Sequence, residues 1–193
     1  MPRFVSFKFV QTITYGAAAF GFGILCSAPA SANEIPQWGG ENKSEIRIPG
    51  ATIEMTTPIL NQANQAGLMA PNTLAMYYLS IDPAAGFAAN INVQKQPYGG
   101  DLSGFRDISI QQFKTLGLTM LDEKLVGNGD DATLKIEYKG PLQGREGHFL
   151  AHAYKIDGGI LLATCTSSPA PAVWAAVKPM CQKGLDSIRI KKD

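Results

Sequence analysis

Two histidines and three cysteines are the residues of this 193-residue chain that could support nucleophilic or metal chemistry. His148 and His152 stand four apart in a segment that alternates like a β-strand. Along a strand that spacing separates two side chains by ~13 Å, which is too far for both to bind one metal ion. We therefore interpret the histidines as polar residues on a half-exposed face, together with Leu150 and Tyr154.

The cysteines allow two kinds of chemistry. Cys26 belongs to an N-terminal segment that is predicted to be removed, which leaves Cys165 and Cys181, an even number for an oxidising compartment. A Cys165–Cys181 disulfide is the prediction, because both residues lie on faces that meet between a sheet and a helix. Geometry is the objection: the helix rises ~15 Å before Cys181, whereas Cys165 is only ~7 Å from the end of its strand.

Two alternatives to the disulfide stay open. One is a pair of buried, inert thiols. The other is a Cys–His enzyme, since Cys165 lies on the strand beside the one that carries His148 and His152. Rapid alkylation of Cys165 in the native state would support the enzyme.

No catalytic motif is found elsewhere. The chain has no His-Glu-x-x-His, no Gly-x-Ser-x-Gly and no phosphate-binding glycine loop. The acidic pairs Asp122-Glu123 and Asp130-Asp131 stand beside turns and lack the alternating oxygen ligands of a calcium loop. We therefore predict no catalytic residue, no metal site and no cofactor.

The N-terminus has the pattern of a cleavable secretory signal peptide over residues 1–32. Arg3 and Lys8 precede an apolar stretch at 13–26, and Ala30 and Ala32 supply the small side chains that signal peptidase requires. Cleavage is predicted between Ala32 and Asn33.

Two other interpretations of this segment are weaker. A transmembrane anchor needs ~20 apolar residues, and this stretch is shorter and interrupted by glycines. A lipoprotein needs a small residue before the acylated cysteine, and Leu25 precedes Cys26. The processed chain is thus predicted to be periplasmic or secreted, with no transmembrane span.

Composition excludes some classes of partner. Removal of Arg3 and Lys8 leaves 15 Lys and Arg against 16 Asp and Glu, a net charge of −1. A near-neutral surface does not favour nucleic acid, whose binding depends on neutralised phosphates. No basic amphipathic helix indicates binding to a membrane surface. The tail residues Arg189, Lys191 and Lys192 are interpreted as a solvated end.

The elements predicted for the processed chain form a single domain at residues 44–193 after a flexible leader at 33–43. Periodicity and turn residues predict eight strands, at 44–48, 52–55, 74–81, 87–95, 118–126, 133–138, 148–156 and 160–166. Residues 58–72 are interpreted as a loop with one helical turn.

Two helices are predicted, one at 101–116 and one that begins between Pro169 and Pro171. The first carries an apolar stripe and the second a longer one with a kink expected at Pro179. The stripes are Leu102, Phe105, Phe113 and Leu116 in the first helix, and Val173, Trp174, Val177, Cys181, Leu185 and Ile188 in the second. Trp174, Tyr77, Tyr78 and Tyr138 could line an apolar pocket, but core packing is the stronger interpretation.

This order of elements resembles the PsbP/DcrB-like superfamily. Phe-Ala-Ala-Asn-Ile-Asn-Val at 87–93, leading into Leu-Ser-Gly-Phe-Arg-Asp-Ile-Ser-Ile-Gln-Gln-Phe-Lys at 102–114, carries the likeness, which covers nearly all of residues 44–190. The resemblance implies an α+β fold, an antiparallel sheet with helices on both faces. Its members include a photosystem extrinsic subunit, a Ran-binding nuclear protein, bacterial envelope proteins and secretion chaperones, and the DcrB-like periplasmic members are the nearest in character.

The resemblance implies binding or assembly without catalysis. It carries over no site residue and names no partner, because a fold does not fix a function. The first hypothesis is therefore an exported accessory domain that binds another envelope protein. The second is a carrier of a small apolar ligand held between sheet and helix, and the third is the Cys–His enzyme.

Overall fold

The structure, a computed structural model, describes residues 42–57, 61–62, 72–82, 87–142, 145–168 and 170–192. The predicted signal peptide and all but the last two residues of the predicted leader lie outside this part. The strands are β1 (Asn42–Ile48), β2 (Ala51–Thr57), β3 (Asn61–Gln62), β4 (Thr73–Asp82), β5 (Phe87–Gln96), β6 (Thr119–Val126), β7 (Thr133–Leu142), β8 (Arg145–Ile156), β9 (Gly159–Ser167) and β10 (Arg189–Lys192). The helices are α1 (Leu102–Thr115), a 3₁₀ turn η1 (Gly129–Asp131) and α2 (Pro171–Asp186).

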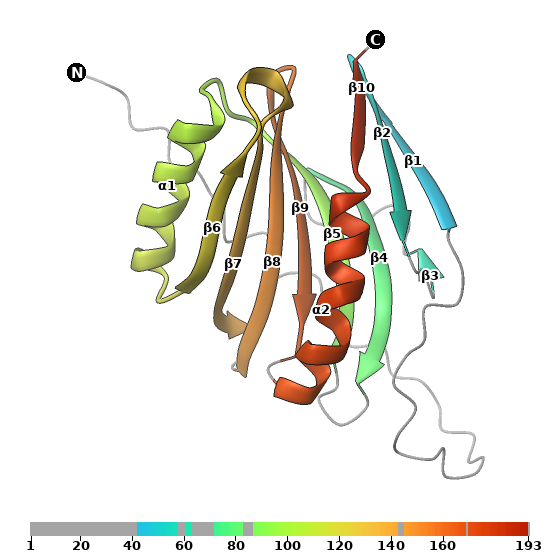
Figure 1. Ribbon diagram of the computed structural model, residues 1–193, viewed down its shortest axis with the longest axis vertical. Coiled ribbons are helices and arrows are strands. Elements are labelled where there is room, and N and C mark those ends of the chain that lie inside the picture. Colours follow the sequence, from blue (N-terminus) through green and yellow to red (C-terminus); the bar gives the residue numbers. More distant parts are fainter. Residues whose placement is uncertain are drawn as a thin grey trace.

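These strands form two antiparallel sheets (Figure 1). Seven strands follow the order β3-β4-β5-β9-β8-β7-β6, and three follow the order β1-β2-β10. The α+β class and the antiparallel sheet are thus as predicted. The separate three-stranded sheet was not predicted, because its third strand comes from the far end of the chain.

Two hairpins show how local sequence sets the register. Gly50 between β1 and β2 has φ +82°, and Gly158 between β8 and β9 has φ +70°. Left-handed backbone of this kind favours glycine because a Cβ atom would be strained there. Each turn then aligns its strands, so that Ile48 lies opposite Ala51 and Ile156 opposite Gly159.

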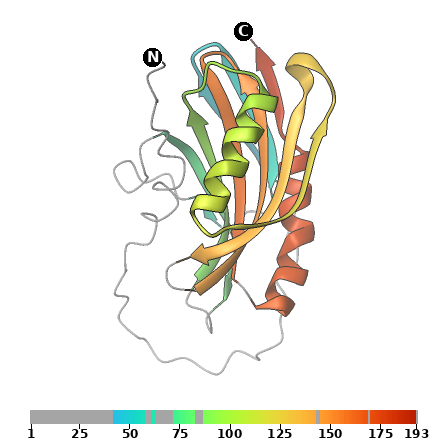
Figure 2. The same cartoon turned by 90° about the vertical axis from the view of Figure 1, so that its left-hand side faces the viewer.

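Alternate side chains of β9 contribute to two separate parts of the core. Leu161, Ala163 and Cys165 pack in a cluster with α2, β4, β5 and residues Ile53 and Met55 of β2. Residues 160 and 162 pack instead with α1, β7 and the odd-numbered positions of β8. Figures 1 and 2 show α2 near the three-stranded sheet and apart from α1, which lies beside β6 in Figure 1.

The helix α1 begins at a side-chain cap. It ends at Thr115, one residue before Leu116, the last residue of its predicted apolar stripe. The Asp101 carboxylate accepts the Gly104 N–H at 2.8 Å, which satisfies one of the free donors at the helix start. Leu102, Phe105 and Phe113 are buried as predicted, but Leu116 is exposed at the C-cap.

The last residues of the chain form a strand that was not predicted, although the cations Arg189, Lys191 and Lys192 are exposed as expected. Arg189–Lys192 is strand β10, and Ile190 pairs with Ile53 of β2. Ile188 is buried and Ile190 packs against the same core cluster. Two isoleucines on the inner face, together with backbone hydrogen bonds to β2, outweigh the exposed cations between them.

Smaller differences concern element boundaries. β1 begins at Asn42, two residues inside the predicted leader. β7 and β8 run several residues beyond their predicted ends, to Leu142 and from Arg145. Most of the predicted 58–72 loop lies outside the described residues, but Asn61–Gln62 within it is a strand paired with β4.

Candidate functional site

The two cysteines of the processed chain are bonded to each other in the structure. Cys165 on β9 and Cys181 on α2 are joined by a disulfide with an S–S distance of 2.02 Å and a Cα–Cα distance of 5.7 Å. Both side chains are fully buried. Since a thiolate is the nucleophile in cysteine catalysis, Cys165 here lacks the free sulfur that a Cys–His enzyme requires.

The histidine face of β8 lies under α2: His148 and Tyr154 are half-buried, close to the prediction, whereas Leu150 and His152 are buried. His148 packs against the ring of Trp174, with ring centroids 5.1 Å apart. The Lys178 ammonium lies 5.9 Å from the centre of the same ring and donates to both carboxylate oxygens of Glu137, at 2.8 and 2.7 Å. This part of α2 is therefore held to β7 and β8 by an ion pair and by the contact between the two tilted rings.

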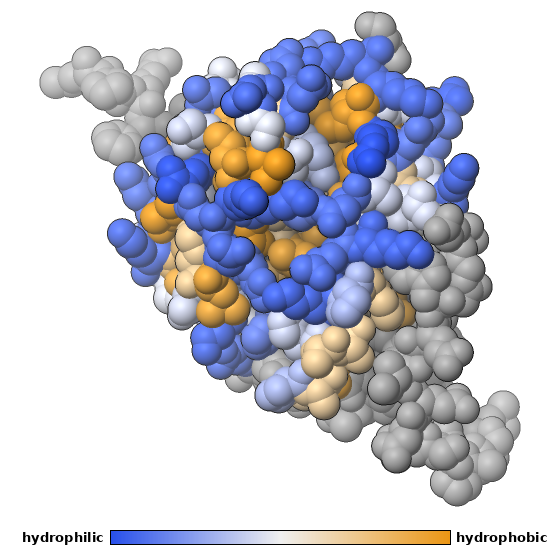
Figure 3. Space-filling view, in the orientation of Figure 1, coloured by the Kyte–Doolittle hydropathy of each residue, from blue (hydrophilic) through white to orange (hydrophobic). Residues whose placement is uncertain are grey.

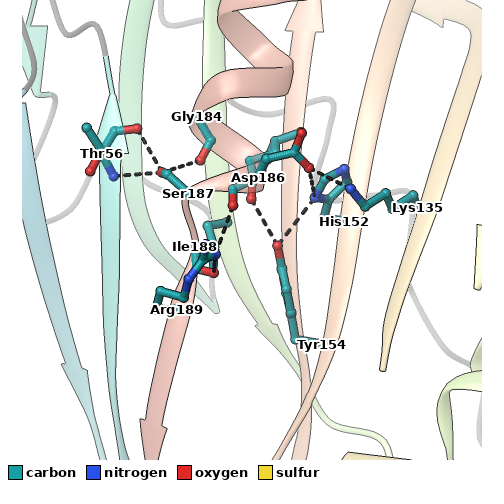
Figure 4. Close-up of polar contacts among 10 residues, drawn as sticks. Thr56, Lys135, His152, Tyr154, Gly184, Asp186, Ser187, Ile188 and Arg189 are labelled. Carbon is teal, nitrogen blue, oxygen red and sulfur yellow. Dashed lines mark hydrogen bonds and ion pairs between the residues drawn. The ribbon is translucent and has the colours of Figure 1, made fainter. Parts of the chain in front are cut away.

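His152 is buried more deeply than His148, with 3% of its surface exposed. Figure 4 shows its ring beside Tyr154 and Asp186 at the far end of α2. The Tyr154 hydroxyl donates to the carbonyl of Leu185 at 3.0 Å, so its oxygen can accept from His152 Nδ1 at 3.3 Å. Lys135 of β7 donates to Asp186 at 2.6 Å. The prediction placed His152 on a half-exposed face because the position of α2 over β8 was not known.

Burial decides the protonation states of His152 and Tyr154. Loss of water around the ring, and then the nearby Lys135 cation, lower the pKa of His152 to about 4, although Asp186 opposes the shift. The Nδ1 of His152 lies 3.9 Å from the nearest Asp186 oxygen. Burial, followed by Asp186, raises the pKa of Tyr154. Both side chains are therefore neutral near pH 7, which suits a hydrogen-bonded structural contact.

A second polar contact ties the end of α2 to the three-stranded sheet. The Ser187 hydroxyl accepts the Thr56 N–H at 2.8 Å, and its oxygen lies 2.9 Å from the Thr56 carbonyl and 2.6 Å from that of Gly184. Arg189 donates to the carbonyls of Asp186 and Ile188 at 2.9 and 2.8 Å. A cation at this position is favourable because the C-terminal end of a helix carries partial negative charge. Ser187 and Thr56 are 131 residues apart in the chain, so no local pattern indicated the contact.

The remaining chemical candidates are also parts of the framework. Asp130 forms an ion pair with Lys192 of β10 at 2.7 Å, and the Asp122 carboxylate accepts the backbone N–H of Glu123 at 2.9 Å. Within the described residues no three His, Cys, Asp or Glu side chains gather as a metal site. The same part of the chain contains no helix long and apolar enough to cross a membrane.

Three of the four aromatic residues considered as pocket lining are core residues, and the fourth, Tyr78, is half-buried. Tyr77, Tyr138 and Trp174 are buried. The Tyr138 ring lies between those of Phe113 and Phe149, at centroid distances of 4.5 and 4.7 Å, and burial raises its pKa.

One surface feature was not predicted. In the part of the chain that the structure describes, the exposed large apolar side chains all fall between residues 116 and 126. They are Leu116, Leu121, Leu125 and Val126, with 40, 47, 43 and 39% of their surface exposed. We call this group, with strand β6, the β6 edge. Figure 3 shows hydrophobic residues among hydrophilic ones on the side where β6 lies in Figure 1.

Structure comparison identifies the architecture. Cyanobacterial PsbP (CyanoP) from Synechocystis sp. PCC 6803 matches with a TM-score of 0.58 at 13% sequence identity, over 86% of this chain and 98% of CyanoP. The chain has a PsbP-like fold. A Pseudomonas aeruginosa protein of unknown function matches with a TM-score of 0.47 at 15% identity, over 71% of this chain and 89% of that protein.

Comparison of the sequence with known sequences does not detect this fold. No family model matches the sequence, and no curated protein matches it. The part of the resemblance that the comparison supports is the PsbP-like arrangement of strands and helices, while the closeness to the DcrB-like members stays a prediction.

Proposed function

We propose that this chain is an exported accessory domain that binds another envelope protein without catalysing a reaction. Export rests on the signal-peptide pattern, with cleavage between Ala32 and Asn33 and a periplasmic or secreted product. The accessory role rests on the PsbP-like fold and on the structural use of the reactive side chains. The sandwich with a helix on each face of the sheet, nearest to the DcrB-like members, belongs to the same proposal.

One observation carries this function: within the described residues, both cysteines and both histidines are committed to structural contacts. Cys165 is bonded to Cys181, His152 is buried against Tyr154, and His148 packs against the ring of Trp174. Active sites instead combine an accessible nucleophile with a base of matched pKa. By contrast, exposed apolar side chains gather at the β6 edge, and such grouping is typical of surfaces that bind other proteins.

The carrier hypothesis is the alternative. A ligand between the seven-stranded sheet and α2 would have to displace side chains that fill this layer, since Tyr77, Leu161, Val177 and Leu185 are each at most 1% exposed. Interiors of this density leave little room without rearrangement.

The test is capture of the partner from the envelope of the native host. The tagged chain is expressed in its host, cross-linked in intact cells and purified from the envelope fraction. An unrelated exported domain with the same tag is the control. A second protein that co-purifies in fixed proportion, and only with this chain, is the expected result.

Two other outcomes would replace the proposal. A bound small molecule in native mass spectrometry of the host-purified protein, without a partner protein, would favour the carrier. Rapid alkylation of Cys165 in the native state would favour the Cys–His enzyme, because the disulfide would then be absent.

A further inference from the structure

β6 is the last strand in the order of the seven-stranded sheet, so one of its sides has no strand partner among the described residues. In an antiparallel strand, alternate residues direct their N–H and C=O groups to opposite sides. The N–H of Glu123 donates to the carboxylate of Asp122 at 2.9 Å. Glu123 and Leu125, on the same alternation, therefore present their backbone groups to the free side, and Leu121 precedes them at the register shift between Met120 and Asp122.

The sequence of this strand is complementary to itself when two copies run antiparallel. Residues that present their backbone to the free side must lie opposite one another, so the register can change only in steps of two. In the register centred on Glu123, each Asp122 lies opposite Lys124 of the other copy, and each Leu121 opposite Leu125. The neighbouring registers instead place Asp122 opposite Asp122, or Lys124 opposite Lys124.

We propose that the β6 edge binds a second copy of this chain through antiparallel β6–β6 pairing over residues 121–125, centred on Glu123. Two Asp122–Lys124 pairs and two Leu121–Leu125 pairs stabilise this register, because cross-strand pairs of opposite charge and of apolar residues are favourable. The two sheets join into one continuous sheet about a two-fold axis, the symmetry typical of homodimers.

The faces of the strand agree with this register. Asp122 and Lys124 lie opposite Glu137 and Lys135 of β7, so they share one face of the sheet. Glu123 and Leu125 lie opposite Ile136 and Leu134 on the other face. Asp122 and Lys124, which oppose each other in this register, therefore point to the same side, as antiparallel pairing requires. The register shift between Met120 and Asp122 ends the regular ladder at Leu121.

The one like-charge contact of the dimer is at its centre, where Glu123 faces Glu123. Each of these carboxylates already forms an ion pair with Arg106 of α1 in its own copy, which offsets their repulsion. In the single chain the Asp122 carboxylate occupies the N–H of Glu123. In the dimer the Asp122 carboxylate leaves the N–H of Glu123 and pairs with Lys124 of the second copy. The N–H of Glu123 then becomes free to bond to the new strand.

The test is a charge exchange within the strand, read by sedimentation velocity of the exported, purified protein over a range of concentrations. Asp122→Lys and Lys124→Asp each place like charges at both pair positions and should weaken association at least about tenfold. The double variant Asp122→Lys with Lys124→Asp restores opposite charges across the interface, so association should return. Lys43→Glu on β1, an edge of the other sheet, is the matched control and should associate like the wild type.

The outcomes separate this inference from the proposed function. A wild-type chain that stays monomeric at all concentrations contradicts the self-pairing, even where an envelope partner is captured through β6. A double variant that folds with an unchanged melting temperature but does not associate contradicts the register. Loss of the dimer leaves the capture experiment unaffected, because that experiment detects a different protein.

Discussion

Cys165 and Cys181 lie at the same level of the layer between β9 and α2, with their Cα atoms 5.7 Å apart. The sequence suggested that they could be out of step, because Cys181 comes ten residues into the helix. The structure resolves this since α2 begins beyond the end of β9 (Figure 1). The helix then runs back along the strand until the two residues meet.

The first prediction concerns the strength of this bond. The bridge spans 16 residues, and closing a loop of that size stabilises a fold by about 3 kcal/mol in the chain-entropy model. The double variant Cys165→Ala, Cys181→Ala should lose roughly this amount in urea unfolding. Denaturation with an alkylating reagent but without reductant should add no alkyl group to the wild type, and two added groups would contradict the disulfide.

A second prediction concerns the β8–β9 turn. A Cβ atom on Gly159 would lie 2.4 Å from the backbone oxygen of Gln96, whereas one on Gly99 would meet nothing within 4 Å. Gly159→Ala should therefore cost about 1–3 kcal/mol, as forced overpacking does. Gly99→Ala is the matched control and should stay within about 0.5 kcal/mol of the wild type. Equal melting temperatures for the two variants would show that β5 and β9 are not this close.

The elements that were predicted well are those with a strong local pattern. β7 alternates along its whole length, and α1 and α2 carry apolar stripes that face their sheets. Periodicity reports such elements because each buries one face against the core. The same patterns also indicated the PsbP-like order of elements before any comparison of structures.

The features that were missed depend on residues far apart in the chain. β10 pairs with β2, and Ser187 bonds Thr56 across 131 positions. The burial of His152 depends on where α2 crosses β8, and the exposure of Leu125 depends on β6 being an edge. None of these is set by local periodicity, so only the assembled fold shows them.

The third prediction tests the contact of α2 with the sheet. Trp174 is 8% exposed and packs against His148, so Trp174→Ala should cost about 3 kcal/mol or more. Ala175→Ser, at an exposed position of the same helix, is the control and should be near neutral. A near-neutral Trp174→Ala variant in thermal unfolding would mean that this end of α2 is not packed on β8.

The fourth prediction concerns export. Signal peptidase should cleave between Ala32 and Asn33, and Ala30→Arg should block this step because it places a large charge where a small side chain is required. Intact mass of the protein recovered from the envelope is the measurement. Ala17→Ser, in the middle of the apolar stretch, should be processed normally. An exported wild-type protein that still begins at Met1 would overturn the cleavage.

The fifth prediction follows from the buried, neutral His152. Its pKa is about 4 in the folded chain and 6.5 in an unfolded one. Between these values the unfolded state binds the extra proton, so the free energy of unfolding decreases as pH falls from about 6.5 to about 4. The full difference corresponds to roughly 3 kcal/mol, all of it retained above pH 6.5.

Comparison with His152→Gln isolates this group from the carboxylates that titrate in the same range. Carboxylates act alike in both proteins, whereas only the wild type carries the imidazole beside Lys135 and Asp186. The variant is expected to be less stable at pH 7, because it loses the contact with Tyr154, but to lose less stability on acidification. Urea unfolding at pH 7, 6, 5 and 4.5 measures both profiles. Parallel profiles would show that His152 takes up a proton as easily in the folded chain as in the unfolded one, and hence that α2 does not shield it from water.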